Sequence, residues 1–282
     1  MGTEGTPDLN SLDLRVDRPH TARVYDYYLG GKTHYEADRE AGDQVMAAWP
    51  GAPLAARVNR SFMLRACRVL ASEYGITQFL DIGTGIPTEP NLHQGVQDLV
   101  PEARVMYVDN DPIVLAHARA LMVGSPEGRT SYLHADFTEP EAILDSDDLR
   151  ATLDLDRPVA LSVLALLHFV PDDRDPGGIL RRLTDALVPG SALVLSHGTG
   201  DFDSEAMGQV ARVYQSSGTG AQARSKEELR ALFHDLELIE PGIEVPHRWR
   251  PETSSVSTIG GGDASADDAA VAQWAGVAIK RR

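Results

Sequence analysis

The stretch Phe79-Leu80-Asp81-Ile82-Gly83-Thr84-Gly85-Ile86-Pro87 decides the fold that the sequence predicts. Its apolar beginning is typical of a short buried strand, and its two glycines place a tight turn where that strand ends. Because glycine has no Cβ atom, the backbone of such a turn can approach a bound ligand closely. We therefore expect a strand, a glycine-rich turn that opens a helix, and a ligand site at the turn.

The rest of the chain alternates between strand-like and helix-like patterns. Five strands are expected, at 76–83, 103–110, 130–137, 159–167 and 191–198. Helices are expected between them, at 88–100, 113–122, 139–144 and 178–187. This alternation predicts an α/β fold with right-handed βαβ units and a doubly wound, mostly parallel sheet. A helix and a strand within 225–245 and a last strand from Trp274 predict an antiparallel hairpin at the sheet edge.

The chain divides into three parts by pattern. Residues 1–18 are polar and are expected to form a flexible lead-in. Residues 19–75 have helical patterns, and we interpret them as a lid. Residues 76–282 form the ligand-binding domain, in which 254–270, rich in Ser, Gly and Asp, are expected to be a surface loop insertion.

Composition narrows the possible partners. The 282 residues include 42 acidic and 26 basic side chains, for a formal charge of −16, which argues against binding nucleic acid or an anionic membrane. The single cysteine, Cys67, excludes an internal disulfide and a cysteine-built zinc site, and no metal is expected. The sequence lacks an apolar run of membrane-spanning length and a signal-peptide pattern, so we expect a cytoplasmic protein. Its oligomeric state is not indicated.

Asp81 distinguishes the glycine-rich turn from a pyrophosphate-binding turn. The pyrophosphate motif has a third glycine where this chain has Thr88. A carboxylate facing the pocket would repel a pyrophosphate but would attract the ammonium group of a zwitterionic amino acid. Gly83, Thr84 and Gly85 would border the same ligand. The alternative is that Asp81 only caps the turn.

Polar residues also follow the next strands. Asp109, with Asn110 beside it, can accept hydrogen bonds from both hydroxyls of a ribose. Asp136 can hold an adenine amino group while Phe137 covers the ring, although a loop acid followed by a core aromatic remains the alternative. The stretch that begins at Ser162 would form the floor of the pocket.

The ordered set DIGTG (81–85), VDND (108–111), HADF (134–137) and SVLALLHFVPDD (162–173) resembles the class I S-adenosylmethionine-dependent methyltransferases. More narrowly, the stretches at 19–40 and 59–66, PHTARVYDYYLGGKTHYEADRE and NRSFMLRA, resemble an actinobacterial methyltransferase family formerly catalogued as a domain of unknown function. This narrower resemblance runs from about residue 19 to the C-terminus, and its N-terminal pattern is specific.

The resemblance implies a Rossmann-like, seven-stranded sheet ending in an antiparallel pair, with S-adenosyl-L-methionine as the cofactor. It implies that Asp81, Gly83 and Gly85 border the methionine moiety, that Asp109 binds ribose, and that Asp136 and Phe137 border adenine. One departure is Pro87, where many members have a third glycine. Because proline is tolerated in the first turn of a helix, we expect the methionine end to be bordered differently, not lost.

The methyl acceptor is expected to bind under the N-terminal helices. Tyr25 and Tyr28, together with Arg23, would exclude water and hold the acceptor, or would alternatively belong to a packed helical hairpin. Arg60 would pair with the donor carboxylate or with a neighbouring acid. His197, at the end of the fifth strand, is the candidate general base, needed only for a protonated acceptor. His168 is interpreted as structural.

The sequence thus favours a methyltransferase that acts on a small molecule which it does not identify. One alternative is a protein that binds the donor but has lost transfer and acts as a sensor. The other is an NAD-dependent oxidoreductase of similar fold, which Asp81 and Thr88 disfavour. Fold alone does not name the acceptor.

Overall fold

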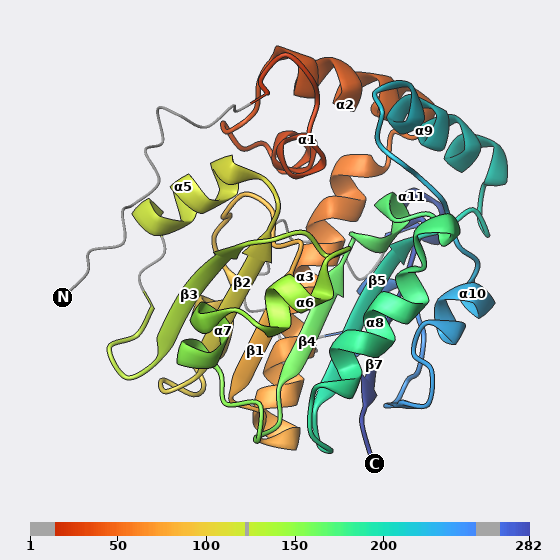
Figure 1. Ribbon diagram of the computed structural model, residues 1–282. Helices are drawn as coiled ribbons and strands as arrows, with labels where there is room; N and C mark the ends of the chain where they lie inside the picture. Colours follow the sequence, from red (N-terminus) through yellow and green to blue (C-terminus); the bar gives the residue numbers. More distant parts are fainter. Residues whose placement is uncertain (1–14, 122–123, 252–265) are drawn as a thin grey trace.

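The computed structural model describes residues 15–121, 124–251 and 266–282, and it confirms the α/β fold (Figure 1). The sheet has the strand order β3-β2-β1-β4-β5-β7-β6, and every pairing is parallel except those of β7 with β5 and β6. Its strands are β1 (Gln78–Ile82), β2 (Arg104–Asp109), β3 (Arg129–His134), β4 (Ala160–Leu164), β5 (Ala192–Gly198), β6 (Glu237–Leu238) and β7 (Gln273–Ile279). The expected strands and the antiparallel edge are all present.

Helices cover both faces of the sheet (Figure 1). The α-helices of the described residues are α1 (Thr21–Tyr28), α2 (Glu36–Ala48), α3 (Ala52–Tyr74), α4 (Leu92–Gln97), α5 (Pro112–Leu121), α6 (Pro140–Leu144), α7 (Asp147–Thr152), α8 (Pro176–Asp185), α9 (Ser204–Ser216), α10 (Lys226–Ala231) and α11 (Asp268–Val271). Short 3₁₀ turns occur at Leu167–Phe169, Asp172–Arg174 and Pro246–Arg248. No helix within the described ranges is long and apolar enough to cross a membrane.

The central strands are buried on both faces, as their continuous apolar runs predict. Alternating side chains of β1 enter two different cores: Phe79 packs with the residues of α3, whereas Leu80 and Ile82 pack on the opposite face with α8. Side chains of a strand alternate between faces, so one short strand joins both halves of the domain.

Helices α1, α2 and α9 lie together over the carboxyl ends of the parallel strands (Figure 1). A core of its own holds them to the start of α3, and Val24, Val45 and Ala56 are buried in it. Helix α9 was not expected from the sequence. It packs against the N-terminal helices from a position far along the chain, after β5.

The sequence-based prediction was wrong about how the glycine-rich turn continues. The helix expected from residue 88 begins only at Leu92, because Asn91 forms its N-cap. Asn91 donates its backbone N–H to Oε1 of Gln94 at 2.6 Å and accepts the N–H of Thr88 at 3.1 Å. Pro87 therefore lies in a loop and not in the first turn of a helix.

Two expected segments lie mainly outside the described residues. Residues 1–14 of the expected lead-in and 252–265 of the expected loop insertion are not described. The described end of the expected insertion forms the start of a short helix, α11.

Substituting Phe62 by alanine should strongly destabilise the fold. This side chain of α3 is fully buried and meets the Trp249 ring edge to face at a centroid distance of 5.3 Å. Removing it leaves a cavity beneath the sheet, at a cost of about 3–5 kcal/mol in free energy of unfolding. Urea unfolding would measure this cost. Leu99→Ala, at a side chain that is 51% exposed, is the control and should change stability little; equal losses would contradict the assignment of the core.

Candidate cofactor and acceptor site

A cavity of about 420 Å³ lies at the carboxyl ends of the strands, beneath the N-terminal helices. Most of the residues proposed from the sequence line it: Asp81, Gly83, Thr84, Gly85, Asp109, Asn110, Asp136, Phe137, Tyr25, Tyr28 and Arg60. Ser162, Arg23 and His197 are not among its lining residues. The volume falls in the range of small-molecule sites.

The backbone of the glycine-rich turn requires glycine at two positions. Gly83 has φ +75°, and a Cβ atom there would lie 2.8 Å from the Leu166 side chain. Gly85 has φ +69°, and a Cβ there would meet no atom within 4 Å. Gly83 also donates its N–H to the carbonyl of Val108 at 2.8 Å, which fastens the turn to the end of β2. The open space beside Gly85 is where a ligand can approach the backbone.

Asp109 is buried at the end of β2 and accepts two backbone hydrogen bonds. Its Oδ2 accepts the N–H of Gly85 at 2.8 Å, and its Oδ1 accepts the N–H of Asp111 at 2.9 Å. Burial raises the pKa of this carboxyl group, and the two backbone donors oppose the rise. A carboxylate has about four acceptor positions, so acceptor capacity remains on both oxygens for a pair of ribose hydroxyls.

Asp81 lies beside Ser162 in the register of β1 and β4. The Ser162 hydroxyl donates to its Oδ1, which explains how Ser162 contributes to the site without lining the cavity. Burial raises the pKa of Asp81, while hydrogen bonds from Ser162 and Thr84 and the charge of Arg60 lower it. Ser162 therefore orients the carboxylate that faces the cavity.

Arg60 uses its guanidinium to hold the loop that precedes α4. It donates to the carbonyl oxygen of Thr88 and, at 2.8 Å, to that of Pro90. The sequence suggested either the donor carboxylate or a neighbouring acid as the partner of Arg60. The hydrogen bonds of Arg60 in the described residues go to backbone carbonyls and not to an acid. Arg60 still lines the cavity, with its charge close enough to Asp81 to lower the pKa of that carboxyl group.

Asp136 is oriented by three donors. Its Oδ1 accepts from the N–H and the hydroxyl of Thr138 at 2.8 and 2.7 Å, and its Oδ2 accepts from the Asn110 amide at 2.8 Å. Burial alone would raise its pKa, but these hydrogen bonds outweigh it and lower the pKa overall. Phe137 is buried beside it and lines the same cavity. An ionised acceptor next to an aromatic ring suits an adenine.

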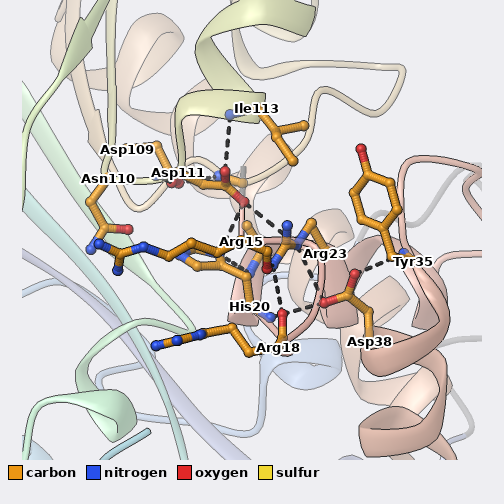
Figure 2. A network of polar contacts seen from close by, with 12 residues as sticks. Arg15, Arg18, His20, Arg23, Tyr35, Asp38, Asp109, Asn110, Asp111 and Ile113 are labelled. Carbon is orange, nitrogen blue, oxygen red and sulfur yellow. Dashed lines mark hydrogen bonds and ion pairs between the residues drawn. The ribbon is translucent and has the colours of Figure 1, made fainter. Parts of the chain in front are cut away.

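Arg23 lies outside the cavity, at the junction between the N-terminal helices and the end of β2 (Figure 2). Its Nε is 3.3 Å from Oδ1 of Asp38 and 3.8 Å from Oδ2 of Asp111. Its Nη2 donates to the carbonyl oxygens of Arg15 and Arg18 at 3.3 and 2.9 Å. Arg23 therefore joins residues 15–18, α1, α2 and the loop after β2, and does not face a substrate.

Asp111 completes this junction from the side of the sheet. Its Oδ1 accepts the N–H of Ile113 at 2.9 Å, as expected of a residue that starts a helix. Its Oδ2 lies 3.2 Å from Nδ1 of His20, which itself lines the cavity (Figure 2). Asp111, two residues after the ribose candidate Asp109, thus also anchors the N-terminal helices.

His197, the candidate base, is buried away from the cavity with both ring nitrogens engaged. Nε2 lies 2.8 Å from Nη1 of Arg224, and Nδ1 lies 2.7 Å from the carbonyl oxygen of Gly198. Arginine can only donate and a carbonyl can only accept, so His197 is held as the neutral tautomer with its proton on Nδ1. Burial and the charge of Arg224 together lower the pKa of His197 to about 4, although its hydrogen bond to the Gly198 carbonyl opposes the fall. We do not retain it as a base.

Sequence reasoning interpreted His168 as structural and missed the contribution of α9. His168 follows the end of β4 and lines the cavity, as do Met207, Val210 and Tyr214 of α9. The position of His168 directly after the apolar run 159–167, which ends at the binding edge, was a usable signal. Helix α9 gave none, because its partners are more than a hundred residues away in the sequence.

These features identify the family. The model of the S-adenosyl methyltransferase family matches residues 8–281. The chain belongs to this family. It is therefore an S-adenosylmethionine-dependent methyltransferase, and S-adenosyl-L-methionine is its cofactor. The open approach to Gly85 and the remaining acceptor capacity of Asp109 fit that molecule.

Two solved structures share substantial sequence identity with this methyltransferase. A DUF574 family protein from Streptomyces avermitilis is 48% identical, with 95% of this chain and 99% of that chain covered and a TM-score of 0.88. A putative methyltransferase from Thermobifida fusca is 37% identical, with 95% and 97% covered and a TM-score of 0.84. No curated protein matches the chain.

A more distant structure shows the fold alone. The plantazolicin methyltransferase BpumL, solved with a triazolic desmethylPZN analog and S-adenosylhomocysteine, is 13% identical, with 93% of this chain and 96% of that chain covered and a TM-score of 0.51. The Rossmann-like methyltransferase fold implied by the sequence motifs is confirmed.

Replacing Arg23 by methionine should loosen the N-terminal helices locally. The substitution leaves the carboxylates of Asp38 and Asp111 facing each other without their buried guanidinium, and breaking such a pair typically costs about 3–5 kcal/mol. The amides of α1 should exchange with deuterium at least about a hundredfold faster, as local opening predicts. Arg39→Met, at an exposed side chain of α2, is the matched control. Unchanged exchange in α1 would contradict the docking role of Arg23.

His197 should make the fold less stable in acid. Its pKa is about 4 in the folded chain and about 6.5 when unfolded, so only the unfolded chain binds its proton between these values. Stability is therefore fully present above pH 6.5 and falls as the pH is lowered towards 4, by up to about 3 kcal/mol from this group. His197→Gln should lose less stability across this window in urea titrations. The surface variant His134→Gln should behave as wild type; a parallel loss in His197→Gln would refute the assignment.

Proposed function

We propose that this methyltransferase acts on a small molecule, bound beneath α1, α2 and α9 next to the methyl donor. The observation that carries the proposal is the continuity of one cavity. The same space is lined by the turn and carboxylates of the sheet, such as Gly85 and Asp109, and by Tyr28 and Tyr214 of the helices above. Donor and acceptor would thus meet in one enclosed volume, which places two reactants together.

The donor would lie along the carboxyl ends of β1, β2 and β3. Asp81, oriented by Ser162, would bind the ammonium group, and Gly83, Thr84 and Gly85 would border the methionine moiety. Asp109 and Asn110 would bind the ribose, and Asp136 and Phe137 would hold the adenine. S-adenosylmethionine supplies a methyl group on a positively charged sulfur. Proximity and orientation then govern transfer.

The N-terminal helices would serve as the lid, within the proposed division into residues 19–75 and 76–282. Tyr25 is tied into the protein by its hydroxyl, which donates to the Ala56 carbonyl at 3.0 Å and accepts from Asn59 at 3.1 Å. Asn59 in turn accepts from Ser196 at 2.6 Å, and Ser196 accepts the N–H of Ala165 after β4 at 3.0 Å. This chain of hydrogen bonds would fix the lid against the strand ends and exclude water.

A small acceptor fits the composition better than a nucleic acid does. The chain carries 42 acidic and 26 basic residues, which disfavours contact with phosphate backbones. A reduced, cytoplasmic setting is part of the proposal and is supported by the single cysteine, Cys67, which is buried in α3.

Asp109→Ala should weaken donor binding while the fold persists. Loss of the two acceptor oxygens removes the proposed ribose contacts and frees the amides of Gly85 and Asp111, at a cost of roughly 1–3 kcal/mol in binding free energy. Calorimetric titration with S-adenosylmethionine and S-adenosylhomocysteine would measure the change. Asp147→Ala, at a fully exposed side chain, is the control.

Parallel titration with NAD tests the remaining alternatives. Binding of NAD without either sulfur compound would contradict the proposed placement of the donor. Intact donor binding without methylation of any small molecule in a cell extract would favour the sensor.

A further inference from the structure

We infer that the acceptor is a neutral, mainly apolar aromatic molecule whose hydroxyl group donates a hydrogen bond to Nε2 of His168. The inference rests on the proposed function and names the substrate class of the same site. It is carried by an unpaired imidazole in the cavity wall and by the uncharged surface around it.

His168 occupies the short 3₁₀ turn Leu167–Phe169, immediately beyond the end of β4. Its side chain lines the cavity. Within the described part of the chain, Nδ1 is buried without a hydrogen-bond partner, and Nε2 is not among the buried unpartnered atoms. A ligand in the cavity cannot reach a buried Nδ1, so Nε2 is the nitrogen that a ligand can meet.

The surroundings of His168 keep its ring neutral. Burial lowers its pKa well below the usual value, and His197 and Arg224 lower it further. The His197 ring meets the His168 ring edge to face at 5.5 Å, and among the described residues no carboxylate forms an ion pair with His168. A neutral imidazole has one acceptor nitrogen. We assign that role to Nε2, the nitrogen that reaches the cavity, and the proton to Nδ1.

The wall beside His168 is aromatic and continuous. Phe169 packs against His168 at a centroid distance of 4.2 Å and against Tyr214 of α9 at 5.0 Å. The hydroxyl of Tyr214 lies 3.4 Å from that of Tyr28 in α1. This aromatic wall, made of Phe169, Tyr214 and Tyr28, joins the loop after β4 to the helices above. Aromatic faces of this kind favour a flat, aromatic ligand.

The wall contributed by α2 and α9 carries no charge among the residues that line the cavity there. These residues are Val45, Met207, Val210, Ala211 and Tyr214. The charged lining residues belong to the donor end: Arg60 holds the loop before α4, and Arg174 contacts Thr138 beside Asp136. An ionised acceptor would lose its hydration here without gaining a counter-ion, which is costly.

His168 would orient a hydroxyl acceptor by accepting its hydrogen bond; because burial keeps its pKa low, it would not hold the released proton. The oxygen lone pair forms the bond to the methyl carbon, the carbon–sulfur bonding pair stays on the sulfur, and the hydroxyl proton is released to water. His197 cannot serve in this way, because its Nε2 already accepts from Arg224. His168 is thus the catalytic residue assigned by the cavity geometry.

The test compares three probes that share one ring system: 2-naphthol, 2-methoxynaphthalene and 2-naphthoate. Calorimetry measures their binding to the wild-type chain and to His168→Leu, with and without saturating S-adenosylhomocysteine. Wild type should bind 2-naphthol roughly three- to tenfold more tightly than 2-methoxynaphthalene, as expected of one neutral hydrogen bond. It should bind 2-naphthoate at least about tenfold more weakly than 2-naphthol, because of the uncompensated charge.

The variants assign the preference to the imidazole. His168→Leu should bind 2-naphthol and 2-methoxynaphthalene equally while its affinity for S-adenosylhomocysteine stays unchanged, and His168→Gln should partly restore the preference through its amide oxygen. His117→Leu, at a partly exposed side chain of α5 outside the cavity, is the control. A preference for 2-naphthol that survives in His168→Leu would overturn the role of His168.

Wild type alone also tests the substrate class, should the leucine variant not fold. Failure to bind 2-naphthol, or binding of 2-naphthoate as tight as that of 2-naphthol, would overturn the neutral aromatic class. Failure of the wild-type chain to bind S-adenosylhomocysteine would instead refute the proposed function. The titrations without that compound separate the two failures, since they probe the acceptor end by itself.

Discussion

The rest of the site depends on one carboxylate, that of Asp109, which accepts the backbone amides of Gly85 and Asp111 at the same time. Hydrogen bonds to an ionised acceptor are stronger than those between neutral groups, and these two join the turn after β1 to the loop after β2. The junction is possible because both strands are parallel and end at one edge of the sheet. The side chain that makes this structural tie is also the one proposed to bind the ribose.

The N-terminal helices depend on this tie as well. Asp111 is positioned by its bond to Asp109, and its second oxygen faces His20 and Arg23. Two buried carboxylates, Asp38 and Asp111, face the guanidinium of Arg23, which is itself only 2% exposed. Arginine suits this place better than lysine, because its planar group addresses the carbonyls of residues 15 and 18 and the acids together. The proposed ribose site and the attachment of the N-terminal helices are thus linked through Asp109 and Asp111.

Local sequence patterns predicted the sheet and the grouping of three acids at its edge because both follow from short-range rules. Apolar runs mark the parallel strands, and the convergence of their carboxyl ends brings together Asp81, Asp109 and Asp136, which are 28 and 27 residues apart in the sequence. The helix start was misplaced because Asn91 forms a cap that outweighs the helical pattern before it. Helix α9 was missed because its place beside α2 depends on tertiary packing with residues far away in the sequence.

The two histidines show most clearly what a sequence leaves open. Both follow or end a strand at the binding edge, and no local pattern tells which one faces the cavity. The contacts of Arg224 determine which histidine faces the cavity. Arg224 donates to Nε2 of His197 and also to the carbonyls of Leu167 and Val170, on either side of His168. The guanidinium therefore withdraws one imidazole from the chemistry while it holds the loop that presents the other. Because Arg224 comes from a separate loop before α10, this assignment exists only in the folded chain.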